Sequence, residues 1–165
     1  MPFLRTPSAH FANLMDYPFN PNYCDLPEGL RMHYVDAGPA EGRVIVCLHG
    51  EPSWSYLYRK MIPGFTAEGF RVIAPDLIGF GKSDKPTEHS DYSYQRHVDW
   101  VRHLLFEHLQ LSAVNLFIQD WGGLIGLRLL AENTERFASA TAANTFLPTG
   151  DQPLGEAFMS WQQQS

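Results

Sequence analysis

A carboxylate at a strand-to-helix corner is the feature that most constrains the fold of this chain. Asp120 follows the apolar run 114–118 and precedes Gly122 and Gly123, so the pattern predicts a strand that turns sharply into a helix at the aspartate. A nucleophile elbow presents a serine at a turn of this kind. An ionised carboxylate in that place needs no neighbouring base before it attacks. It suits displacement at a saturated carbon, which leaves an ester on the enzyme.

The rest of the chain alternates apolar runs with helical patterns. We predict strands at 30–35, 44–48, 71–74, 113–118 and 137–143, and helices at 56–65, 94–109 and 122–132. This alternation predicts an α/β fold with a mostly parallel sheet and helices on both of its faces. Residues 1–29 show little periodicity and are expected to wrap the surface, and 77–86 is expected to be a loop.

The composition disfavours several classes of partner. Among the 165 residues, 12 basic against 18 acidic side chains give a net charge of −6, which disfavours nucleic acid and anionic membranes as partners. No apolar window approaches the roughly 20 residues that span a bilayer, and no signal peptide is visible at the N-terminus. Cys24 in a polar loop and Cys47 in an apolar strand predict no disulfide framework, which favours a reducing, cytoplasmic location.

A histidine is missing from the place where this architecture needs one. In nucleophile-elbow enzymes the triad runs from nucleophile to acid to histidine along the chain. All seven histidines precede the aspartate of the elbow: His10, His33, His49, His89, His97, His103 and His108. The chain therefore carries a nucleophile without its usual base. Because it ends at 161–165 without a capping signal or a polar tail, we expect it to be truncated.

Two strand ends are predicted to lie side by side and to form an oxyanion hole. Glu51 lies in the His-Gly-Glu-Pro segment 49–52, directly after the run 44–48, and its N–H would join that of Trp121. The alternative is that 49–52 is only a tight turn. The indole N–H of Trp121 is a donor with no acceptor capacity, which suits holding a departing halide in a dry pocket. The alternative is a large side chain that fills space behind the turn.

Three motifs together closely resemble the haloalkane dehalogenases over nearly the whole chain. They are His-Gly-Glu-Pro at 49–52, Ala-Pro-Asp-Leu-Ile-Gly-Phe-Gly-Lys-Ser-Asp-Lys-Pro at 74–86, and Gln-Asp-Trp-Gly-Gly at 119–123. The resemblance implies the α/β-hydrolase fold, with 1–145 as the N-terminal portion of the core and 146–165 as the start of a helical cap. It also implies that the C-terminal part is missing. It points to the subgroup with glutamate after His-Gly and two halide-binding tryptophans.

The resemblance also assigns roles to individual residues. It implies that Asp120 is the nucleophile, that Trp121 is the first halide ligand, and that Glu51 and Trp121 supply the oxyanion-hole N–H groups. The Glu51 side chain would also help to position the hydrolytic water. Trp161 matches the second halide-binding tryptophan, with a core face shared with Phe158 as the alternative. The implied partners are a small halogenated alkane, water and halide, and no cofactor or metal is implied.

The resemblance places the remaining catalytic groups outside this chain. Asn144 ends the last predicted strand, where another subgroup carries its third carboxylate, so the acid and the histidine base are both expected beyond Ser165. We expect at most one turnover, a trapped ester on Asp120, and dependence on a missing C-terminal half for stability. One alternative is an epoxide hydrolase, which usually has histidine before the aspartate and an aromatic residue after His-Gly, where this chain has Gln119 and Glu51. A non-catalytic fragment of the fold is the other main alternative, since a nucleotide-binding module would need a phosphate loop.

Other polar residues are predicted to be structural. Asp76 and Asp84 flank a glycine-rich loop and are expected to fix its turns through Asx-type hydrogen bonds. His97, His103 and His108 lie on one predicted helix without metal-ligand spacing, so we expect them at the surface or in the core.

Overall fold

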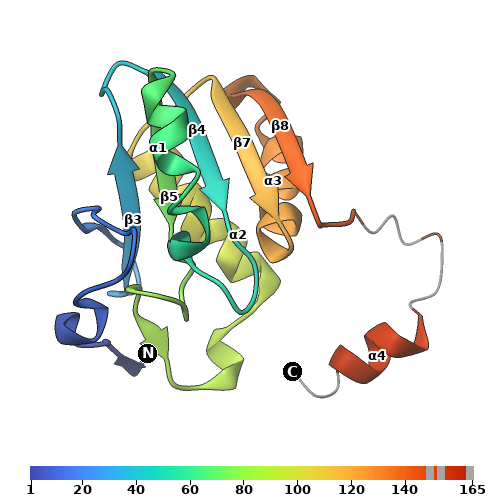
Figure 1. Cartoon of the computed structure of the whole chain (residues 1–165). Coiled ribbons are helices and arrows are strands. Elements are labelled where there is room, and N and C mark those ends of the chain that lie inside the picture. Colours follow the sequence, from blue (N-terminus) through green and yellow to red (C-terminus); the bar gives the residue numbers. More distant parts are fainter. Residues whose placement is uncertain (148–150, 152–154, 163–165) are drawn as a thin grey trace.

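A computed structural model describes the chain except for residues 148–150, 152–154 and 163–165 and the side chains of residues 161 and 162 (Figure 1). The strands are β1 (Phe3–Leu4), β2 (Asn22–Asp25), β3 (Arg31–Ala37), β4 (Arg43–Leu48), β5 (Phe70–Pro75), β6 (Lys85–Pro86), β7 (Val114–Gln119) and β8 (Phe137–Ala143). The α-helices are α1 (Ile62–Ala67), α2 (Tyr94–Arg102), α3 (Trp121–Glu132) and α4 (Glu156–Gln162). Short 3-10 helices lie at Ser8–Phe11, Ser55–Tyr58, His89–Asp91 and Thr134–Arg136, and a π-helix at His103–His108 continues α2.

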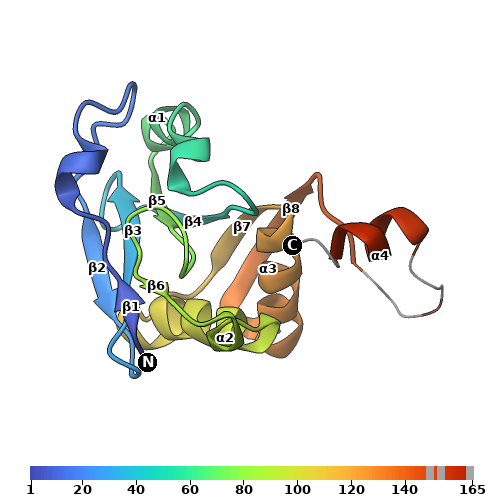
Figure 2. The ribbon, with the colours of Figure 1, turned by 90° about the horizontal axis from the view of Figure 1, so that it is seen from below.

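Six strands form one mixed sheet in the order β2-β3-β5-β4-β7-β8. The pairs β2–β3 and β3–β5 are antiparallel, and the pairs β5–β4, β4–β7 and β7–β8 are parallel. Helix α1 covers one face of the sheet, and α2 and α3 cover the other (Figure 2). The predicted α/β architecture is therefore confirmed.

The core consists of two apolar layers, one on each face of the sheet. Successive side chains of a strand point to opposite faces, so a strand between two helical layers is apolar throughout. In β4, Ile45 and Cys47 join the layer next to α1, whereas Val46 and Leu48 join the layer next to α2 and α3. Trp100 of α2 is among the largest fully buried side chains of that second layer.

The prediction for residues 1–29 is partly wrong. Residues 22–25 form β2, which pairs with β3 at the edge of the sheet, so Cys24 is fully buried rather than placed in a polar loop. The strand has only four residues, and Asp25, the last of them, is exposed, so the pattern is too short to indicate a strand. The N-terminal β1 pairs with β6, and this places another short strand inside the predicted loop 77–86.

Two predicted helices are each divided in the structure. The prediction of one helix at 56–65 is wrong, because a 3-10 helix at Ser55–Tyr58 is followed by a separate α1 at Ile62–Ala67. Pro63 lies in the first turn of α1, where its missing N–H costs no intrahelical hydrogen bond. The predicted helix 94–109 is confirmed in extent, but its second half is the π-helix at His103–His108.

In the described part of the chain, β8 has one hydrogen-bonded neighbour, β7. Five of its seven residues are exposed, in contrast to the buried strands at the centre of the sheet. The described helices include none that is long and apolar enough to cross a membrane.

Candidate active site

The backbone at Asp120 adopts a conformation that amino acids with side chains rarely occupy. Its φ of 52° and ψ of −128° turn the chain from β7 into α3 within one residue. The following glycines are required by close contacts: a Cβ on Gly122 would lie 2.2 Å from the Leu48 carbonyl oxygen, and one on Gly123 would lie 2.0 Å from Thr145 Oγ1. The glycines in the motif 119–123 therefore allow the strand, the helix and the turn to pack at this corner.

The Asp120 carboxylate lies against the loop that follows β4. Strands β4 and β7 are parallel neighbours, with Leu48 opposite Ile118, so their carboxyl ends meet at one edge of the sheet. The Glu51 N–H donates to Asp120 Oδ1 at 2.9 Å. A Cβ on Gly50 would lie 2.1 Å from the same oxygen, so glycine is needed for this approach. The structure thus brings Glu51 and Asp120 together as predicted from the sequence.

The end of β8 holds the turn from the other side. The Asp120 N–H donates to the Asn144 carbonyl oxygen at 3.1 Å, and Thr145 Oγ1 donates to the Asp120 carbonyl oxygen at 2.9 Å. Thr145 was not identified from the sequence. The signal for it is its position two residues after the predicted strand 137–143, whose end reaches the same edge of the sheet.

Trp121 borders two cavities that differ in size and in their contact with Asp120. The smaller cavity, about 240 Å³, is lined by Asp120, Trp121, Leu124, Phe146 and Phe158. The larger, about 550 Å³, also reaches Trp121 and Phe158 but does not include Asp120. The smaller cavity is therefore the one in which a small molecule would lie beside Asp120.

Tyr94 packs against Trp121 and is a second residue that sequence reasoning missed. Its ring centroid lies 6.3 Å from that of Trp121, and its hydroxyl donates to the Leu124 carbonyl oxygen at 2.9 Å. The backbone of Trp161 lies in α4, but its side chain lies outside the described residues, so its halide-binding role stays a prediction.

Two histidines near the site, His49 and His97, are kept neutral because burial disfavours the charged imidazolium. His49 Nε2 accepts the Leu77 N–H at 2.9 Å, and Nδ1 lies 2.9 Å from the Gly50 carbonyl oxygen, to which it donates. Burial lowers the pKa of His49. Burial, with a smaller contribution from His49, lowers the pKa of His97 to about 4. With both ring nitrogens of His49 occupied, it cannot take a proton from water without losing a hydrogen bond.

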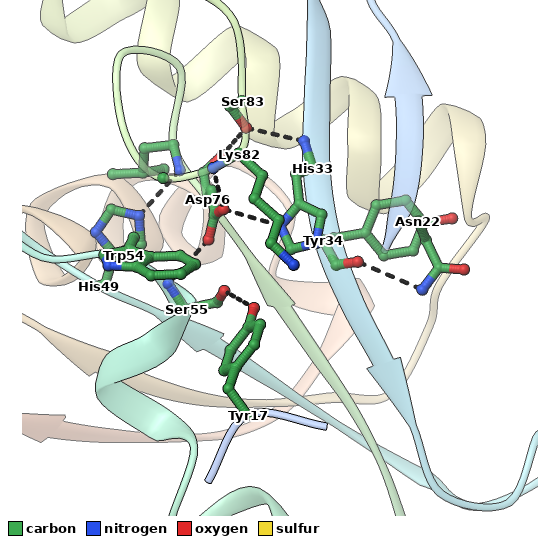
Figure 3. A network of polar contacts seen from close by, with 12 residues as sticks. Tyr17, Asn22, His33, Tyr34, His49, Trp54, Ser55, Asp76, Lys82 and Ser83 are labelled. Atoms are coloured by element: carbon green, nitrogen blue, oxygen red, sulfur yellow. Dashed lines mark hydrogen bonds and ion pairs between the residues drawn. The ribbon is translucent and has the colours of Figure 1, made fainter. Parts of the chain in front are cut away.

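Asp76 does more than fix its own turn, which corrects the prediction for it. Its carboxylate is fully buried; Oδ1 accepts the Ser55 N–H at 2.9 Å, and Oδ2 accepts His33 Nδ1–H at 2.8 Å and the Lys82 N–H at 2.7 Å (Figure 3). Burial alone would raise the pKa of Asp76. The hydrogen bond and the charge of His33, together with the hydrogen bonds from Ser55 and Lys82, hold this pKa below its ordinary value. The group is therefore an ionised carboxylate in the interior.

Asp84 also makes long-range contacts instead of the predicted local turn. Its buried carboxylate accepts two hydrogen bonds from the Arg5 guanidinium, at 2.7 and 2.6 Å, and one from the Arg31 N–H at 2.8 Å. These contacts tie the N-terminal segment to the loop that follows β5.

Comparison with known proteins agrees with this geometry. Residues 43–164 match the family described as alpha/beta hydrolase fold. The chain belongs to the α/β-hydrolase fold family. It is 59% identical to a haloalkane dehalogenase of Psychrobacter cryohalolentis, over 99% of this chain and 55% of that protein. It is 57% identical to one of Mycolicibacterium paratuberculosis, over 98% of this chain and 55% of that protein.

Solved structures give the same picture of an α/β hydrolase. A tetrameric haloalkane dehalogenase from Paraglaciecola agarilytica superposes with a TM-score of 0.93 at 46% identity, over 99% of this chain and 55% of that one. An epoxide hydrolase from Vigna radiata superposes with a TM-score of 0.74 at 27% identity, over 87% of this chain and 46% of that one. The α/β-hydrolase chain thus spans about half the length of the relatives that it matches.

Proposed function

We propose that this chain carries the nucleophilic half of a haloalkane dehalogenase. Asp120 attacks the halogen-bearing carbon, a C–O bond forms as the C–halogen bond breaks, and the bonding pair leaves with the halide. The observation that carries this proposal is the Glu51 N–H 2.9 Å from Asp120 Oδ1, which fixes the carboxylate and leaves Oδ2 to attack. The relatives at 59% and 57% identity support the same activity.

The halide is proposed to leave toward the indole of Trp121. An indole N–H placed at the edge of an apolar cavity stabilises an anion that forms there and offers no group that competes as an acceptor. Trp121 lines the same cavity as Asp120, which fits this role. Trp161 is proposed as the second halide ligand, on the resemblance alone.

Hydrolysis of the ester is proposed to use the same N–H that holds the free carboxylate. Water attack on the ester carbon places negative charge on Oδ1 of Asp120, where Glu51 N–H already donates, and the Trp121 N–H is proposed as the second donor. The base and the third acid are proposed to come from outside this chain. The expected outcome for the chain alone is therefore one turnover and a trapped ester.

The wider assignments of the proposal rest on the resemblance. Residues 1–145 would be the N-terminal portion of the core and 146–165 the start of the cap, completed by a C-terminal half that also supports stability. Conversion of a haloalkane to an alcohol and halide would detoxify the substrate. Cys24 and Cys47 are both free, which fits the proposed cytoplasmic location.

An epoxide hydrolase activity is the second candidate. Solved epoxide hydrolases are similar in structure at 31% and 27% identity, well below the identity to the dehalogenases. Gln119, directly before Asp120, and Glu51, directly after His-Gly, match the dehalogenase motifs instead. The dehalogenase proposal is therefore the better supported of the two.

The test is the intact mass of the folded chain after incubation with 1,2-dibromoethane. We expect one 2-bromoethyl adduct, absent from the Asp120→Asn variant, whose amide is a much weaker nucleophile. Circular dichroism on both proteins establishes that they are folded. No adduct on folded wild-type chain would contradict the proposal that this chain performs the first step, and an adduct that persists in Asp120→Asn would place the nucleophile elsewhere.

A further inference from the structure

The loop that carries Glu51 is held at both ends by two consecutive residues after β5. At its start, the Leu77 N–H donates to His49 Nε2 at 2.9 Å. At its end, Asp76 Oδ1 accepts the Ser55 N–H at 2.9 Å. The segment 50–54 between these two attachments contains the N–H that donates to Asp120.

We propose that Asp76 is a positioning residue for Glu51: its buried carboxylate fixes the loop 50–55 so that the Glu51 N–H points at Asp120 Oδ1. Asp76 does not touch the reacting atoms and acts through Ser55 and the loop. This inference rests on the proposed function for the use of the Glu51 N–H, but the geometry it describes is measurable without turnover.

A carboxylate is the side chain that this position requires. Asp76 receives three N–H donors, from Ser55, His33 and Lys82, and it offers no donor in return. An amide of the same shape would turn its own NH₂ toward at least one of these N–H groups. Burial of a charge is costly unless hydrogen bonds compensate it, and here three do. We therefore expect that neutralising the Asp76 carboxylate would weaken its hydrogen bond with the Ser55 N–H and release the loop 50–55.

The surrounding chain is shaped to admit this carboxylate. A Cβ on Gly81 would lie 2.3 Å from Asp76 Oδ2 and 2.8 Å from Trp54 Cε3, so the loop after β5 closes tightly over both groups. Gly81 has a φ of 49°, which also favours glycine. Trp54 directly precedes Ser55, so the same closure packs the far end of the Glu51 loop.

The N-terminal segment adds a second attachment at the same residue. The Tyr17 hydroxyl and Ser55 Oγ lie 2.6 Å apart in a buried hydrogen bond, as Figure 3 shows. Ser55 is therefore held through its backbone by Asp76 and through its side chain by Tyr17. The two contacts can be removed separately, which allows the contribution of the carboxylate to be isolated.

The experiment follows the Glu51 amide by ¹H–¹⁵N NMR in the 165-residue chain. We expect Asp76→Asn to shift this amide toward its position in Asp120→Ala, which lacks the acceptor, and to speed its hydrogen exchange about 10-fold to 100-fold, the loss expected for one charge-assisted hydrogen bond. Asp84→Asn is the matched control, because it neutralises another buried carboxylate of the same loop, whose hydrogen bonds go to Arg5 and to the Arg31 N–H and not to residues 50–55. It is expected to leave the Glu51 amide in place.

A second pair of variants covers the case in which Asp76→Asn does not fold. Ser55→Pro removes the N–H that donates to Asp76, and Trp54 before it is already extended (φ −159°, ψ −175°), as proline demands of its neighbour. Ser55→Ala keeps this N–H and loses the contact with Tyr17. We expect the Glu51 amide to move in Ser55→Pro and to stay in Ser55→Ala.

An unchanged Glu51 amide in folded Asp76→Asn or Ser55→Pro would overturn the positioning role. Equal changes in Asp76→Asn and Asp84→Asn would also overturn it, since they would reflect general loosening. The rate of alkylation by 1,2-dibromoethane provides the functional readout and is expected to fall in Asp76→Asn but not in Asp84→Asn. Absence of any adduct in the wild-type chain would contradict the proposed function and leave the NMR result to decide the positioning role.

Discussion

Strain at Asp120 leads to a stability prediction that separates the backbone from the side chain. Asp120→Gly and Asp120→Ala both remove the carboxylate, but only glycine adopts a φ of 52° with a ψ of −128° without a steric penalty. We therefore expect Asp120→Gly to be the more stable of the two variants. The side chain of Asp120 makes no capping hydrogen bond to α3, so its removal costs no cap.

The magnitude follows from a matched pair at another helix start. Ser93 is the N-cap of α2 with a φ of −151°, where alanine and glycine are both unstrained. The alanine-to-glycine difference at residue 93 includes the entropy of the unfolded chain and the preference of N-caps for glycine over alanine. Subtracting it from the difference at residue 120 leaves the strain alone, which is about 1–3 kcal/mol for a side chain in a sparsely populated region.

Urea unfolding followed by circular dichroism measures the free energies of unfolding of the four variants, which are Asp120→Ala, Asp120→Gly, Ser93→Ala and Ser93→Gly. All four variants must show the same dependence of free energy on urea concentration, because a change in this slope would mean a change in the unfolded or native ensemble. An alanine-to-glycine gain in stability at residue 120 that is no larger than the gain at residue 93 would contradict this prediction. In that case the turn at Asp120 would not be strained.

Three further results are expected from the buried groups and the close contacts. Because burial lowers the pKa of His97 to about 4, the unfolded chain binds a proton between pH 6.5 and pH 4 that the folded chain does not, so stability falls as pH falls through this window. His97→Phe should remove up to about 3 kcal/mol of that fall in urea titrations at pH 7 and pH 4.5, and an unchanged fall would assign it to other groups. Gly123→Ala should destabilise the fold by about 1–3 kcal/mol, because the new Cβ would lie 2.0 Å from Thr145 Oγ1. Adding Thr145→Gly to the same chain should recover part of this loss. Additive effects of the two changes on the free energy of unfolding would contradict the contact. Burial raises the pKa of Cys24 to about 11 and of Cys47 to about 12. A disulfide reagent at pH 8 should therefore label both thiols in urea and neither in the native chain. Rapid labelling of the native chain would contradict the burial of the two thiols.

The central sheet could be predicted from the sequence because its strands carry a strong local signal. Strands β4 and β7 are apolar or nearly so along their length, and each leads into a glycine-containing turn, so both the strand and its end are visible in the pattern. The closeness of Glu51 to Asp120 followed from the rule that carboxyl ends of parallel strands meet at one edge. β2 escaped prediction because four residues at the edge of a sheet carry too little periodicity.

The polar network around Asp76 could not be predicted because its partners are distant in the chain. Ser55 lies 21 residues away and His33 lies 43 residues away, on a different strand of the sheet. Locally, an aspartate before a glycine-rich loop has the pattern of an Asx turn, and nothing near it in sequence indicates three donors. A glycine-rich turn can be recognised from the sequence alone. The convergence of hydrogen-bond donors on a buried charge depends on the tertiary fold.

The strained turn at Asp120 depends on a largely exposed strand at one edge of the described sheet. A backbone conformation of this kind persists only where its surroundings hold it. Here two residues directly after β8 do so: the Asn144 carbonyl oxygen accepts from the Asp120 N–H, and Thr145 Oγ1 donates to the Asp120 carbonyl oxygen. In the described part of the chain β8 pairs with β7 alone and is largely exposed. Local opening that separates β8 from β7 would therefore also release the turn, because the same residues end the strand and fix Asp120. Amides of β8 and of residues 120–123 should then exchange with one common rate, faster than those of β4.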